Sequence, residues 1–152
     1  MRTGIVLVGL LTAMVASAQE NGPTAQRVAQ RVDLDSVTAL VVTLASCAAL
    51  HSAAAEMLEH ELPDHAETAR RRAQADQYTA MYLLAEDRVA KGGAPRALTS
   101  YTSYVEQLTA AGLERMTAIL TKGDVAAFQK EEDLCSSLIA LEDEALAKIG
   151  AE

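Results

Sequence analysis

Apolar residues recur along the chain at alternating steps of four and three, the spacing of one face of an α-helix. The longest such stripe follows Asp35, which we expect to cap the helix at its N-terminus. It comprises Val37, Val41, Leu44, Ala48, His51, Ala55, Leu58 and Leu62. Pro63 should end this helix, because the residue before a proline disfavours the helical conformation.

Three further helices are predicted after Pro63. Asp64 and Glu67 have the spacing of a capping box at the start of the second helix, which should stop at Lys91-Gly92-Gly93. Its stripe is Ala66, Ala69, Ala73, Ala80 and Leu84. Pro95 suits the first turn of the third helix. The stripe of this helix is Leu98, Tyr101, Val105, Leu108, Gly112, Met116 and Ile119.

Lys122 and Gly123 should close the third helix, and Asp124 should cap the fourth. The fourth stripe is Val125, Phe128, Cys135, Leu138 and Ile149. Because the connections are short, successive helices should be antiparallel neighbours. The sequence therefore predicts an all-α fold, an up-down-up-down four-helix bundle over residues 35–152. Residues 19–34, which include Val28 and Val32, are expected to form a lead-in segment.

Residues 1–18 have the pattern of a cleaved secretory signal peptide. Arg2 is followed by an uncharged apolar run and then by Ala16-Ser17-Ala18, an A-x-A cleavage site. The run has about a dozen residues, fewer than the roughly 20 that a spanning helix needs. No later segment is expected to span a membrane. We therefore expect a periplasmic or secreted protein.

Cys47 and Cys135 are the two cysteines of the chain. In an exported protein such a pair is expected to form a disulfide, here between the first and fourth helices. The bridge would stabilise the fold by on the order of 4 kcal/mol. An active thiol pair is the less favoured interpretation, because the C-x-x-C spacing is absent.

Composition narrows the class of protein. Alanine occupies 30 positions, whereas aromatic residues make up 3% of the chain. Small residues on the predicted stripes indicate closely packed helices with little room for a cofactor, and none is expected. The net charge of −8 argues against a nucleic-acid partner. The familiar catalytic motifs are absent, so we expect a protein that is not an enzyme.

All three histidines fall within one polar segment, which also contains several acids. Its candidate metal ligands are His51, Glu56, His60, Glu61 and His65. Imidazole and carboxylate groups suit Zn or Cu, so a periplasmic metal-binding protein is the alternative function. However, His51 and His60 point to nearly opposite helix faces. His51 lies on the apolar stripe instead, where it could contact the disulfide or an acid of the fourth helix (Glu131, Glu132 or Glu142) as a pH-sensitive pair.

The remaining candidates concern the surface. The run Arg70-Arg71-Arg72 is expected to be solvated or paired with Glu67 and Asp76. Acid runs at 131–133 and 142–144 should face mostly solvent. Tyr78, Tyr82, Tyr101 and Tyr104 could form one interface patch between the second and third helices. The favoured function is an exported binding or accessory protein, for example an inhibitor-like or immunity-like one. Its partner is expected to be another protein, contacted through the tyrosine patch or the acidic face of the fourth helix, and a second copy of the chain is the alternative partner.

Overall fold

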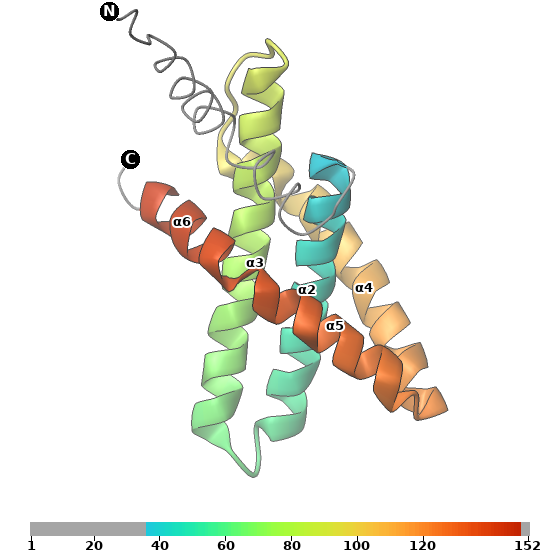
Figure 1. The fold of residues 1–152 in the computed structure, drawn as a ribbon. Helices are drawn as coiled ribbons and strands as arrows, with labels where there is room; N and C mark the ends of the chain where they lie inside the picture. The colour runs from blue at the N-terminus through green and yellow to red at the C-terminus, as the bar shows by residue number, and fades with distance from the viewer. Residues whose placement is uncertain (1–35, 150–152) are drawn as a thin grey trace, which may run out of the picture.

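The computed structural model describes residues 36–149, and all of its regular structure is helical. The elements are α2 (Val37–Leu58), α3 (Pro63–Ala90), the short 3-10 helix η1 (Leu98–Tyr101), α4 (Thr102–Lys122), α5 (Val125–Ser137) and α6 (Ile139–Ile149). Successive long segments reverse direction, and α5 and α6 together form the fourth (Figure 1). The predicted signal peptide and lead-in segment lie outside the described residues.

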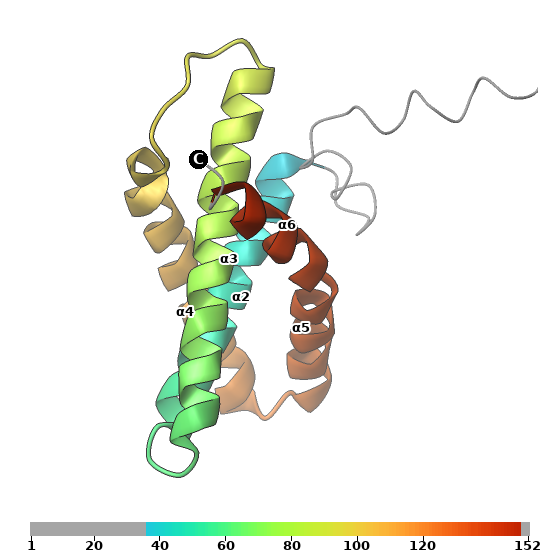
Figure 2. The ribbon, with the colours of Figure 1, turned by 90° about the vertical axis from the view of Figure 1, so that its left-hand side faces the viewer.

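Helix α2 is the centre of the fold. It packs against α3, α4 and α5, while α6 packs against α3 (Figure 2). The predicted stripe positions Val41, Leu44, Ala48 and Ala55 are buried. Leu62, the last predicted position, is 47% exposed because α2 ends at Leu58. The N-cap is Ser36 rather than Asp35, and its side chain accepts a hydrogen bond from the Ala39 amide at 3.2 Å.

Among the described residues, helix α2 is long and apolar enough to cross a bilayer, although no segment after residue 18 was expected to be. Half of its most apolar 18-residue stretch is buried inside the protein. Helices that other helices surround are commonly this apolar.

Two predicted helix starts were wrong. Helix α3 begins at Pro63 itself and has no side-chain cap, so Asp64 lies within the first turn and the capping box does not form. Proline is tolerated there because a helix leaves its first N–H groups unpaired in any case. Pro95 precedes the third helical segment, which starts at Leu98. The Arg88 side chain donates to the Ala94 carbonyl at 2.8 Å and thus helps to hold the intervening loop.

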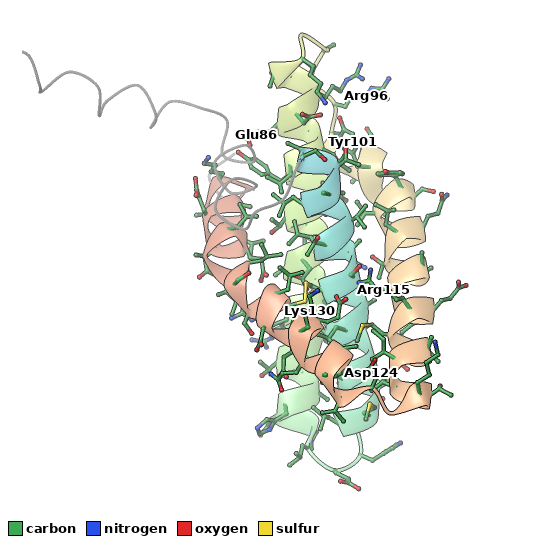
Figure 3. All side chains as sticks on the ribbon, turned by 45° about the vertical axis from the view of Figure 1, so that its right-hand side comes forward. Glu86, Arg96, Tyr101, Arg115, Asp124 and Lys130 are labelled. Carbon is green, nitrogen blue, oxygen red and sulfur yellow. A yellow bond between two sulfur atoms is a disulfide. The ribbon has the colours of Figure 1, made fainter. Side chains whose placement is uncertain are left out.

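The predicted boundary between the third and fourth helices is confirmed. Gly123 adopts φ +65° at the end of α4, and the Asp124 side chain accepts from the Ala127 amide at 3.0 Å. Figure 3 shows Tyr101 and Asp124 at opposite ends of α4. Val125, which was expected on the buried stripe, is instead 76% exposed just beyond the cap.

The fourth helix is interrupted at Leu138, which separates α5 from α6. The Ser137 hydroxyl donates to the Leu134 carbonyl at 2.6 Å, and the Leu138 amide bonds to Cys135 three residues earlier. Such local bonds to backbone carbonyls compete with the regular α-helical pattern. The chain therefore bends, and α6 crosses over to α3.

The predicted disulfide is confirmed. Cys47 of α2 and Cys135 of α5 are bonded, with their Cα atoms 5.5 Å apart. Close helix packing is confirmed where α4 crosses α2: a Cβ on Gly112 would lie 3.1 Å from the Ser46 Cα.

Candidate functional site

Four ionisable side chains from three helices meet inside the fold. His51 comes from α2, Arg72 and Asp76 from α3, and Glu142 from α6; we call these four residues the buried network. The Nδ1 atom of His51 lies 2.7 Å from Oδ2 of Asp76. The Nη1 atom of Arg72 donates to Oε2 of Glu142 at 3.1 Å. The first bond joins the consecutive helices α2 and α3, and the second joins α3 to α6 across 70 residues of sequence.

The two acids of the network are shielded from solvent. Asp76 is 0% exposed and Glu142 is 1% exposed. Oδ1 of Asp76 and Oε1 of Glu142 are the oxygens that His51 and Arg72 leave unused, and neither finds a hydrogen-bond donor in the described part of the chain. The two carboxyl groups instead interact with each other. A hydrogen bond between two carboxyl groups requires a proton on one of them, because a carboxylate only accepts.

The pKa of Glu142 is raised from its ordinary value of 4.5 to about 7, and burial is the largest cause. The negative charge of Asp76 and the hydrogen bond to it also raise this pKa, whereas Arg72 lowers it. Arg72 therefore offsets only part of the desolvation. The network can take up and release a proton near neutral pH, which is uncommon for a carboxyl group and typical of functional sites.

The direct partner of His51 differs from the one expected. Sequence reasoning offered the disulfide or an acid of the fourth helix, but Asp76 on α3 holds the imidazole. Glu142, one of the suggested acids, enters the network through Asp76 and Arg72. The imidazole is 24% exposed, whereas Asp76 and Glu142 are shielded from solvent.

A signal for Asp76 and Glu142 does exist in the sequence. Asp76 lies four residues before the buried Ala80 and three after the buried Ala73, and so falls on the α3 stripe. Glu142 follows the buried Leu138 by four residues and precedes the buried Ala145 by three. The acid run at 142–144 was expected to face mostly solvent, and its first member is the exception.

The structure does not assemble the predicted metal ligands. Glu56, His60, Glu61 and His65 are exposed around the turn between α2 and α3, whereas His51 is bonded to Asp76. Over residues 36–149, no three His, Cys, Asp or Glu side chains are grouped so that they could hold a metal ion.

The side chains of Arg70, Arg71 and Arg72 point in different directions, as expected for successive residues of a helix. Arg71 and Arg70 approach the Glu67 carboxylate at 3.0 and 3.5 Å, and their hydrogen bonds, with their positive charges, lower the pKa of this carboxyl group. Arg72 points the other way, to Glu142. Its pairing with an acid on α6 was not foreseen.

The four tyrosines have different surroundings. Tyr82 is half-buried, donates to Glu86 at 2.9 Å, and has Lys148 of α6 over its ring at 5.9 Å. Tyr78 is 47% exposed and lines a shallow groove with Met81, Leu98 and Thr102. Tyr104 is 44% exposed on α4, and Tyr101 is half-buried in η1. Their role as interface residues stays a prediction.

The acid runs place most of their carboxylates on the outside of α5 and α6. Glu132, Asp133, Asp143 and Glu144 are exposed and form what we call the acidic face. Gln129 donates to Glu132 and Asp133, and Lys148 pairs with Glu144 at 3.3 Å. Glu131 points instead toward α4, where it accepts from Arg115 at 2.9 Å.

Comparison with family models, with curated proteins and with solved structures gives no significant match for this chain.

Proposed function

We propose that this protein is an exported accessory protein that binds a basic partner protein through the acidic face. The observation that carries the proposal is the outward display of Glu132, Asp133 and Asp143 on a helix pair whose first member is fastened to α2 by the disulfide. Because α5 is covalently held, Glu132 and Asp133 keep a fixed arrangement, which lowers the entropic cost of binding.

Charge supports this class of partner. The chain carries a net charge of −8, and complementary charge increases the rate and the selectivity of association between proteins. An inhibitor-like or immunity-like protein that covers a basic enzyme is one form of this function. The export signal would place the encounter in the periplasm or outside the cell.

Site-specific photo-crosslinking in the producing cell tests the proposal. A crosslinker at Glu132 should capture one basic protein, and a crosslinker at the exposed Glu114 of α4 should not. The captured protein would then be purified and titrated calorimetrically. Binding should weaken by about tenfold or more in the double variant E132K/D133K and at high salt.

The matched control is E106K/E114K, which makes the same change of charge at exposed positions of α4. It should bind as the unaltered protein does. Equal capture from both crosslinker positions, an acidic captured protein, or equal loss of affinity in both double variants would contradict the proposal.

A further inference from the structure

The position of Glu142 suggests a conformational role for the buried network. Glu142 is the network residue that α6 contributes, and α6 begins immediately after the bend at Leu138. The disulfide at Cys135 fastens α5 to α2 but lies before that bend. Helix α6 can therefore move about Leu138 without breaking a covalent link.

A small set of side chains docks α6 on α3. Leu141 and Ala145 are its buried apolar side chains among the described residues, and Lys148 lies over Tyr82. The other strong contact is Glu142, whose carboxyl group touches Arg72 and Asp76 on α3. Because α6 buries little apolar surface, its docking on α3 depends on the electrostatic state of the carboxyl groups of Asp76 and Glu142.

We propose that α6 is a pH-sensitive element, docked on α3 while Asp76 and Glu142 share a proton and released from α3 when that proton leaves. Loss of the proton removes the hydrogen bond between the two carboxyl groups and leaves two adjacent negative charges, both buried. Undocking exposes Glu142 to water and relieves the repulsion. This movement does not require the partner protein proposed above.

The charged groups around Glu142 determine the direction of the response. Arg72 of α3 favours the ionised form, but burial and Asp76 oppose it more strongly, so the pKa of docked Glu142 is about 7. His51 of α2 faces Asp76 from the other side. The acids of α5 are engaged elsewhere or exposed: Glu131 binds Arg115, and Glu132 and Asp133 face solvent. Docking is therefore favoured at low pH.

The size of the pH response follows from the difference between the pKa values of Glu142 in docked and undocked α6. If the undocked residue returns to its ordinary pKa of 4.5, the opening equilibrium of α6 rises roughly tenfold per pH unit between about pH 4.5 and pH 7. It then levels off. Between pH 5 and pH 8 the increase is on the order of 50-fold.

Hydrogen exchange of the full oxidised protein, corrected for the intrinsic pH dependence of exchange, tests the proposal. Protection of α6 should fall on the order of 50-fold from pH 5 to pH 8, while α5 keeps its protection. In Glu142→Gln, which retains the size of the side chain but cannot ionise, α6 should remain equally protected at both values. Asp143→Asn is the matched control on the same helix, and its α6 protection should change with pH as it does in the unaltered protein.

His51→Gln tests the side chain that contacts Asp76 from α2. This variant should keep a response in α6. The proposal is overturned if Glu142→Gln still loses protection with rising pH, if His51→Gln alone abolishes the response, or if α5 and α6 open together.

Discussion

The Nδ1 atom of His51 and the Oδ2 atom of Asp76 lie 2.7 Å apart and join the central helix to α3. Asp76 is fully buried, and its carboxyl group also interacts with that of Glu142. One carboxylate thus connects α2, α3 and α6.

Replacing Asp76 with Ala should strongly destabilise the protein. The change leaves the His51 imidazole and the buried Glu142 carboxyl group without a partner, and a buried polar group that loses its partner typically costs about 1–3 kcal/mol. Urea unfolding followed by circular dichroism measures the loss. Asp87→Ala removes an ion pair with Lys91, whose side chain is exposed, and should cost less than about 1 kcal/mol. Similar losses in the two variants would contradict the structural role of Asp76.

The protein should become less stable as the pH rises from about 4.5 to about 7. Because folding raises the pKa of Glu142 to about 7, the native state binds a proton that the unfolded chain has already lost in this range. Protonated Glu142 therefore stabilises the fold fully below pH 4.5, and the contribution is lost through pH 7. The loss should reach at most about 3 kcal/mol. Unfolding curves at several pH values measure it, and Glu142→Gln should flatten this part of the profile.

Removing the disulfide should destabilise the fold without removing the other contacts between its helices. Cys47 and Cys135 close a loop with a sequence separation of 88, for which the chain-entropy model gives about 4–5 kcal/mol. The double variant Cys47→Ala/Cys135→Ala should show this loss in denaturant unfolding. Alkylation, without reductant, of the protein isolated from the producing cell should add no mass. Labelled cysteines in freshly isolated protein would show that the bridge does not form in the cell.

Gly112→Ala should destabilise the crossing of α4 over α2. The new Cβ would meet the Ser46 Cα at 3.1 Å and the Ala49 Cβ at 3.2 Å, so the two helix backbones must separate. Alanine gains about 1 kcal/mol of helix propensity over glycine, but the strain should exceed that gain and leave a net loss of about 1–2 kcal/mol. Thermal unfolding measures this, with the exposed Thr117→Ala on the same helix as a near-neutral control. A raised melting temperature in Gly112→Ala would contradict this prediction and would mean that α4 and α2 can separate at little energetic cost.

Local chemistry explains which helix boundaries the sequence could predict. Gly123 and Asp124 act through their own backbone and side-chain geometry, so the boundary between α4 and α5 was correct. Prolines were less informative, because Pro63 and Pro95 each restrict a backbone without setting where a helix starts. The bend at Leu138 was missed. It depends on a serine bond to the backbone within a stretch whose apolar period is uninterrupted.

The candidate site was predicted only in part. His51 was recognised as a histidine on a buried face, and a pH-sensitive pair with an acid was anticipated. Its partner Asp76 was not anticipated, because periodicity shows which face of a helix is buried but not which residue of another helix lies opposite. Arg72 and Glu142, which are 70 residues apart, became partners only through the bend that turns α6 onto α3.

The sequence by itself determined an all-helical protein with four helical segments and a disulfide between Cys47 and Cys135. Its pattern of apolar residues and its cysteine count are sufficient for these features because both act through short-range geometry or through unique pairing. Only the tertiary structure decided that Asp76 and Glu142 are buried side by side. The ionisation of a carboxyl group depends on the charges and the solvent excluded around it, and these come from three helices that meet only in the folded protein.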